Sequence, residues 1–256
     1  ALPLAIHSKT PVLFTLHFQV PTSSYNRDRY LVLRKYRHLP FTSISDSQRG
    51  DIGLNFIATV YNSLSLADFP FQERPEEYFV WLGKVNPVKG TKEAILAAKK
   101  ARVKLLVIGK IDTGMPKMLD YYEKDIKPLI DGKQIMWQGE VAVDEKARLL
   151  AGAKAFLNPI QWEEPFGLVM IEAQAVGTPV ISFRRGAAPE LIKDGETGFL
   201  VENISEMVDK IGSIDSIDRK ACRRNVEERF TVEKMLHGYE KAYTIAIDNW
   251  EKYKHP

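Results

Sequence analysis

The stretch that decides the fold runs from Asn158 to Val180 and reads NPIQWEEPFGLVMIEAQAVGTPV. A short apolar strand, residues 155–157, leads into its polar loop. A mostly apolar helix follows the loop and stops at Gly177, and a second strand covers residues 180–183. Strand, loop, helix and strand in this order are the repeating unit of a parallel sheet with helices on its faces.

Two of the carboxylates on this unit have seven residues between them. Glu164 is in the loop, and Glu172 is inside the helix, which we expect to begin near Phe166. The first turn of a helix leaves backbone N–H groups without partners, so those of Phe166, Gly167 and Leu168 are predicted to face an anionic or hydroxyl-rich ligand. The helix dipole alone also favours a glutamate at this place. Glu172 lies among apolar residues, however, and a buried carboxylate needs a partner, which favours a pair that contacts a ligand.

The same alternation of strands and helices continues on the N-terminal side of this unit. Strands are predicted at 78–82, 103–108, 134–138 and 155–157, and helices at 91–101, 115–130 and 144–151. Right-handed crossovers between such strands produce a doubly wound parallel α/β sheet of the Rossmann-like class. Ligands of this class bind at the carboxyl ends of the strands.

The beginning and the end of the chain have a different pattern. Residues 1–76 are predicted to form a partial second α/β domain and a linker, with strands at 11–18, 41–45 and 57–61 and helices at 26–38 and 47–53. Residues 77–230 form the predicted main domain, and residues 231–256 a long C-terminal helix. Because the first domain would have a meagre core, we expect a missing upstream segment or a partner chain.

Composition excludes several classes of protein. The chain has 256 residues, 45% apolar and 27% charged, which is ordinary for a globular protein. A formal net charge of +3 is too weak a bias to indicate nucleic-acid binding. Cys222 is the only cysteine, so neither an internal disulfide nor a thiol metal site is expected. With no apolar run of membrane-spanning length and no signal peptide in view, we expect a cytoplasmic location.

The loop after the first strand of the main domain carries two lysines between glycines. It runs from Gly83 to Gly90 and contains Lys84 and Lys89. Two cations between a strand and a helix suit a diphosphate, although the spacing matches neither a Walker motif nor Gly-x-Gly-x-x-Gly. The alternative is a solvated surface loop, since exposed lysines are common.

The motif around the two glutamates, EPFGLVMIEA followed by GTPVI at 177–181, resembles the E-x7-E motif of retaining glycosyltransferases with the GT-B fold, family four, also called glycosyl transferases group 1. Further matches follow in family order: Gly83-Lys84, Lys89-Gly90, LVIG at 106–109, GEV at 139–141, AGA at 151–153 and PELIKDGETGFLV at 189–201. This resemblance implies two Rossmann-like domains around a cleft and a nucleotide-sugar donor held by the C-terminal one.

The resemblance also implies roles for single residues. Glu164 would contact the donor sugar near the reacting centre, and Glu172 would accept hydrogen bonds from the ribose. The backbone of Phe166, Gly167 and Leu168 would hold sugar hydroxyls and phosphate. Next to Gly83, Lys84 stands where the family usually has arginine; with Lys89 it would neutralise the diphosphate. His17 matches the family's Thr-x-His, whose histidine touches the sugar.

On this basis we expect a retaining glycosyltransferase, or its donor-binding portion, that moves a sugar from a nucleotide diphosphate sugar to an acceptor. The acceptor stays open between a glycan, a lipid-linked molecule and a small molecule. The resemblance implies neither metal nor cofactor. The alternatives are a non-catalytic module that binds a sugar nucleotide and a GT-B sugar-nucleotide epimerase. The basic segment 27–37 either contacts an anionic lipid surface or is a solvated amphipathic helix.

Overall fold

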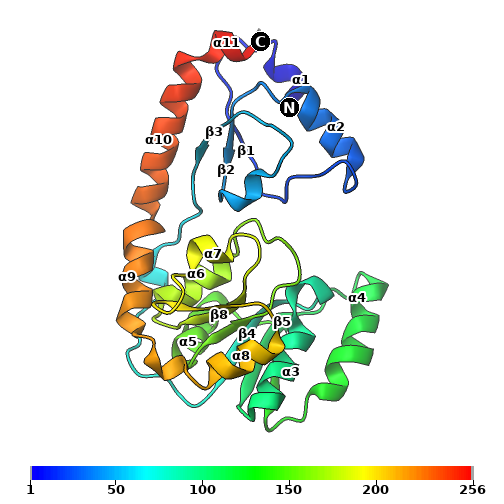
Figure 1. The fold of residues 1–256 in the computed structure, drawn as a ribbon, viewed down its shortest axis with the longest axis vertical. Coiled ribbons are helices and arrows are strands. Elements are labelled where there is room, and N and C mark those ends of the chain that lie inside the picture. The colour runs from blue at the N-terminus through cyan, green and yellow to red at the C-terminus, as the bar shows by residue number, and fades with distance from the viewer. Residues whose placement is uncertain (1, 255–256) are drawn as a thin grey trace.

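The protein is described by a computed structural model that covers residues 2–254. It has two parallel α/β units, one above the other, joined along one side by the long helix α10 (Figure 1). The upper unit has a three-stranded sheet in the order β1-β2-β3, and the lower unit a six-stranded sheet in the order β6-β5-β4-β7-β8-β9. The predicted doubly wound α/β fold class is confirmed. No helix in residues 2–254 is long and apolar enough to cross a membrane.

The six-stranded sheet is parallel throughout. Its strands are β4 (Phe79–Lys84), β5 (Leu105–Lys110), β6 (Ile135–Gly139), β7 (Phe156–Asn158), β8 (Val180–Phe183) and β9 (Gly198–Val201). The chain builds outward from β4 to β6 and then returns to place β7 on the other side of β4. The strand order therefore reverses between β4 and β7, and a doubly wound sheet binds ligands at such a reversal, beyond the carboxyl ends of the strands.

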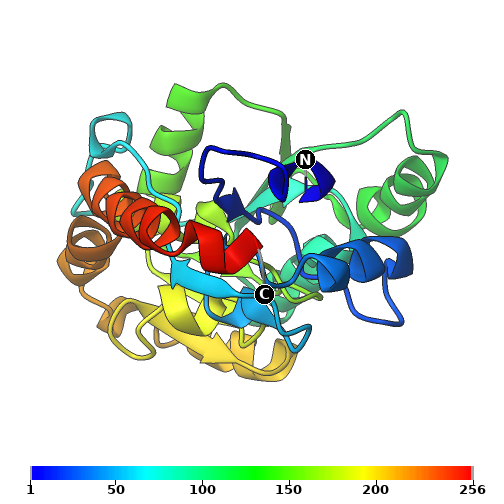
Figure 2. The ribbon, with the colours of Figure 1, turned by 90° about the horizontal axis from the view of Figure 1, so that it is seen from above.

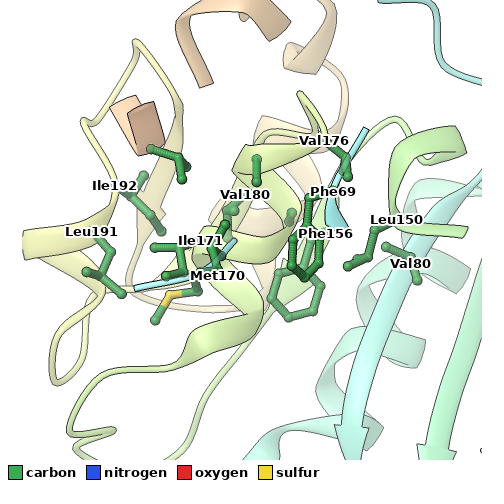
Figure 3. Packing of buried hydrophobic residues seen from close by; sticks show 14 of the residues in the cluster. Phe69, Val80, Leu150, Phe156, Met170, Ile171, Val176, Val180, Leu191 and Ile192 are labelled. Atoms are coloured by element: carbon green, nitrogen blue, oxygen red, sulfur yellow. The ribbon is translucent and has the colours of Figure 1, made fainter. Parts of the chain in front are cut away.

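Helices cover both faces of this sheet. They are α3 (Thr91–Ala101), α4 (Pro116–Tyr121), α5 (Val143–Gly152), α6 (Leu168–Ala175), α7 (Ala188–Leu191), α8 (Ile204–Ile211) and α9 (Arg219–Arg229). One apolar cluster lies under α5, α6 and α9 and includes Phe156, Met170 and Ile171, which Figure 3 shows packed together. A second cluster lies on the opposite face under α3 and α8. Burial on both faces explains why the strands read as continuous apolar runs.

The prediction of one regular helix at 115–130 is wrong. It divides into α4, a π-helical turn at Tyr122–Ile126 and a 3-10 turn at Lys127–Leu129. Pro128 lies in the last turn. Because proline has no N–H and its ring clashes with the carbonyl of the preceding turn, an α-helical hydrogen-bond pattern cannot continue through it.

The upper unit is less regular than its sequence predicts. Its elements are α1 (Leu2–Ala5), β1 (Phe14–Thr15), α2 (Arg27–Lys35), β2 (Phe41–Ser43), a 3-10 turn at Ser47–Arg49, β3 (Phe56–Thr59) and a second 3-10 turn at Leu66–Asp68. The strand predicted at 11–18 is reduced to two half-buried residues, because only one neighbouring strand pairs with it. The helix predicted at 47–53 is a single turn that ends at Gly50, whose φ of 58° leaves the helical region.

The C-terminal helices connect the two units. α10 (Val232–Asp248) begins at the end of α9 and packs against β3, and α11 (Trp250–Lys254) buries Trp250 in the apolar cluster of the upper unit. Gly238 lets α10 lie close to the Val60 side chain, because a Cβ at position 238 would be 3.0 Å from Val60 Cγ1. Figures 1 and 2 place α10 and α2 on opposite sides of the three-stranded sheet. Ala1 and residues 255–256, the ends of two predicted domains, lie outside the described residues.

Candidate functional site

Two loops meet where the order of the large sheet reverses. The loop after β4 ends at Gly90, and the loop after β7 begins at Pro159. Gly90 has a φ of 72°, and a Cβ there would lie 2.0 Å from the carbonyl oxygen of Pro159. Only glycine combines that backbone conformation with that approach. The contact brings Lys89, just before Gly90, beside Glu164 in the second loop.

Lys89 and Glu164 form an ion pair inside this junction. The Lys89 ammonium group pairs with Glu164 Oε2, and the side chains are 30% and 15% exposed. Trp162 donates from Nε1 to the same carboxylate oxygen at 3.0 Å, and its ring centroid lies 5.1 Å from Lys89 Nζ. Sequence reasoning missed Trp162, although a tryptophan two residues before the glutamate was the available signal. The cation and the carboxylate are thus held together by one aromatic side chain.

Helix α6 starts beside this ion pair, two residues later than predicted. It begins at Leu168, and Gly167 occupies the N-cap position with a φ of 90°. In the part of the chain that the structure describes, the N–H groups of Gly167, Leu168 and Val169 donate to no protein acceptor. The Phe166 ring is buried and packs on Phe230. The start of the helix therefore presents backbone donors next to Lys89 and Glu164.

Glu172 lies one turn into α6 and has a partner that the sequence did not indicate. Lys146 on α5 places Nζ 2.7 Å from Glu172 Oε1, and the two side chains are 22% and 13% exposed. The other oxygen, Oε2, is buried and has no hydrogen-bond partner among the described residues. No local sequence pattern links the two residues, because only the tertiary packing of α5 beside α6 brings them together. The pair leaves one carboxylate oxygen able to accept a hydrogen bond.

Three adjoining cavities open along the carboxyl ends of the strands. The main cavity, about 590 Å³, and a second one of about 270 Å³ share Lys89, Glu164, Gly167 and Val169. A third cavity of about 220 Å³ shares Leu82, Gly83 and Lys84 with the second and continues to Lys110, Glu140 and Lys146. We call this series the trough. Lys84, exposed at the end of β4, and Lys89 both line its middle part.

The upper unit supplies the opposite wall of the main cavity. His17, which follows β1, lines this cavity together with Glu164 and Lys89. Its side chain is exposed. The structure thus brings six of the predicted site residues around one space: His17, Lys89, Glu164, Phe166, Gly167 and Leu168. Glu172 lines none of the three cavities; it lies behind the trough, paired with Lys146.

Hydrogen bonds hold the two walls against each other. Ser45 Oγ donates to the carbonyl oxygen of Pro165 at 2.6 Å. The Glu190 carboxylate on α7 accepts from the backbone N–H groups of Asp46 and Ser47 at 2.8 and 2.7 Å, and from Tyr61 Oη at 3.1 Å. Burial, together with the charge of Glu190, raises the pKa of Tyr61 to about 12. The hydroxyl therefore stays protonated and keeps donating at neutral pH.

Comparison with known proteins places this arrangement in context. The family model described as glycosyl transferases group 1 matches residues 67–229. An uncharacterized 41.2 kDa protein of the cps region of Klebsiella pneumoniae is 28% identical over 75% of this chain and 56% of its own length. N-acetyl-alpha-D-glucosaminyl L-malate synthase of Bacillus anthracis is 28% identical over 66% of this chain and 45% of its own length. The chain thus spans about half the length of these curated relatives.

Solved structures share the fold at low sequence identity. Sucrose-phosphate synthase from Thermosynechococcus elongatus superposes with a TM-score of 0.80 at 19% identity, over 94% of this chain and 69% of the other. Anabaena HepE in complex with UDP and glucose superposes with a TM-score of 0.76 at 16% identity, over 95% of this chain and 74% of the other. Both matches extend over the upper and the lower unit.

Proposed function

Because the chain belongs to the glycosyl transferases group 1 family, we propose that it transfers a sugar from a nucleoside diphosphate sugar to an acceptor hydroxyl with retention of the anomeric configuration. One observation carries this proposal most directly. The ion pair of Lys89 and Glu164 lies at the start of α6, beside unpartnered backbone N–H groups and open to the trough. This is a place where an anionic leaving group and a sugar fit side by side.

The diphosphate would lie along the middle of the trough. Lys84 and Lys89 place two cations there, of which Glu164 offsets one, and the N–H groups at the start of α6 add donors at the positive end of a helix dipole. These groups are fixed before the reaction, so they stabilise the charge that develops on the diphosphate as it leaves. The proposal therefore requires no divalent metal at the diphosphate.

The nucleoside would continue beyond the diphosphate toward α5. Among the described residues Glu172 Oε2 has no partner, and Lys146 holds the other oxygen in place. A ribose hydroxyl that donates to this oxygen would satisfy a buried acceptor that otherwise costs stability. Since HepE was solved with UDP, uridine diphosphate sugars are the first donors to test.

The sugar would occupy the main cavity between Glu164 and His17. In the transfer step the acceptor oxygen bonds to the anomeric carbon, and the bond from that carbon to the diphosphate oxygen breaks. The electron pair of the broken bond goes to the diphosphate, which also takes the proton of the acceptor hydroxyl. Attack from the side of the leaving group keeps the configuration. In this reaction Glu164 orients the sugar and forms no covalent intermediate.

Product analysis tests this proposal. The chain is incubated with UDP-, GDP- and ADP-sugars, with and without a panel of sugar and lipid acceptors. We expect release of the nucleoside diphosphate, and a product whose anomeric proton in NMR shows the configuration of the donor. Binding without release would favour the non-catalytic module, and a changed sugar still attached to its nucleotide would favour the epimerase. Inversion would contradict the proposed mechanism.

A further inference from the structure

The main cavity extends beyond the donor loop to a wall of polar and aromatic side chains from the upper unit. Phe18, Gln19, Tyr25, Asn26 and Arg29 line it. These residues come from the segment after β1 and from the first turn of α2, which Figure 1 shows at the edge of the upper unit. If the donor sugar lies at Glu164, this wall faces the direction from which an acceptor must approach.

Arg29 is the charged side chain of this wall, and its charge is not neutralised. Within residues 2–254, Arg29 forms no ion pair and no side-chain hydrogen bond with another residue. Lys89 and Lys146, by contrast, are each paired with a glutamate. If His17 is counted as neutral, the charges of Lys89 and Glu164 cancel. The lining of the main cavity then keeps the single positive charge of Arg29.

The Arg29 side chain is exposed, and its guanidinium group lies over an aromatic ring. Its central carbon lies 4.4 Å from the centroid of the Phe18 ring. A cation on an aromatic face is stabilised electrostatically. A guanidinium carries five N–H donors, and within residues 2–254 those of Arg29 have no protein acceptor. Arg29 is thus a donor group over the Phe18 ring that is available to a ligand.

We propose that Arg29 binds an anionic group, a carboxylate or a phosphate, on the acceptor and so holds the acceptor hydroxyl beside the donor sugar. This inference rests on the proposed function, because it takes the donor to lie at Glu164. A guanidinium matches both groups with two parallel hydrogen bonds. Gln19, Tyr25 and Asn26 are neutral groups that donate and accept, as recognition of a sugar or polyol next to the anion requires.

The test compares ligands that differ mainly in charge. Glucose, glucuronate and glucose 6-phosphate are titrated by calorimetry into the chain saturated with the nucleoside diphosphate that binds it. The variants are R29Q and, as a matched control on the exposed side of α2, R34Q. We expect at least one anionic sugar to bind roughly tenfold or more tightly than glucose, as a charge-assisted hydrogen bond predicts. R29Q should abolish this preference, and R34Q should keep it.

The outcomes separate this inference from the proposed function. Nucleotide binding is measured first in every variant, and its absence in the wild-type chain would contradict the proposed function itself. If nucleotide binds but the three sugars bind equally, or if R29Q keeps the preference, the anionic acceptor site is refuted. R29Q and R34Q could instead lose the preference for anionic sugars equally and bind phosphatidylglycerol vesicles equally less well than the wild type. That result would assign Arg29 to a charged membrane-facing surface and likewise overturn the proposal. The glucuronate and glucose 6-phosphate arms distinguish a carboxylate from a phosphate.

Discussion

Replacement of Lys146 by methionine should destabilise the protein through Glu172. Methionine keeps much of the packing of the lysine stem and removes only the cation. The partner carboxylate is 13% exposed, and one of its oxygens already has no hydrogen bond within residues 2–254. Loss of one member of a fully buried ion pair costs about 3–5 kcal/mol. Because Lys146 is 22% exposed and solvent screens part of the interaction, we expect a loss of about 1–3 kcal/mol.

The assay is urea unfolding followed by circular dichroism, with thermal unfolding alongside. For a chain of this size, each kcal/mol lowers the Tm by roughly 2–4 °C, so K146M should melt about 2–12 °C below the wild type. The double variant K146M/E172Q is the control. It removes the lone charge, so it should recover most of the stability that K146M loses. The reasoning is refuted if K146M unfolds like the wild type, or if the double variant is less stable than K146M.

Three further predictions use other parts of the structure. Gly90→Ala should lower the free energy of unfolding in urea by about 2–4 kcal/mol, because its Cβ would clash with Pro159. The control Gly132→Ala, at a φ of 70° with open space around it, should lower it by only about 1 kcal/mol. Equal losses of stability in the two variants would contradict the close approach of Gly90 to Pro159. Since the folded pKa of Tyr61 is about 12, above the ordinary value of 10.0, the folded state holds its proton more tightly. Its stabilising contribution is present below pH 10 and is lost as the pH rises toward 12. Tyr61→Phe should flatten this decline, and an unchanged decline would show that burial and Glu190 do not raise the pKa of this phenol. EDTA should leave nucleoside diphosphate release unchanged, and loss of release that Mg²⁺ restores would contradict metal independence.

The large sheet was predictable because its signals are local. Strands buried on both faces read as apolar runs. Glycine and proline mark the ends of elements, as Gly177 does after helix α6. The start of α6 was placed too early because the motif does not reveal that Gly167 takes a φ of 90° and serves as the N-cap. The upper unit was predicted less well, since β1 has only one neighbouring strand and so remains short.

The site was predictable only where it follows one loop or one helix. Glu164 and Glu172 stand on one motif, so their spacing was visible. Lys146 is 26 residues away from Glu172, and no pattern in the sequence pairs a lysine of one helix with a glutamate of the next. Arg29 likewise reads as one cation among several on a basic helix. Its position over Phe18 depends on how the start of α2 lies against the segment after β1.

The central claim is that the trough binds a nucleoside diphosphate sugar. Calorimetric titration of the wild-type chain, E172Q, K89A and the control K117A, whose lysine lies on α4 away from the trough, tests it most directly. We predict saturable binding of one UDP-, GDP- or ADP-sugar to the wild type and to K117A. Binding should be about tenfold or more weaker in K89A and in E172Q, where a neutral amide replaces the carboxylate. Absence of binding to all of these donors, or equal affinity in all four proteins, would contradict the account.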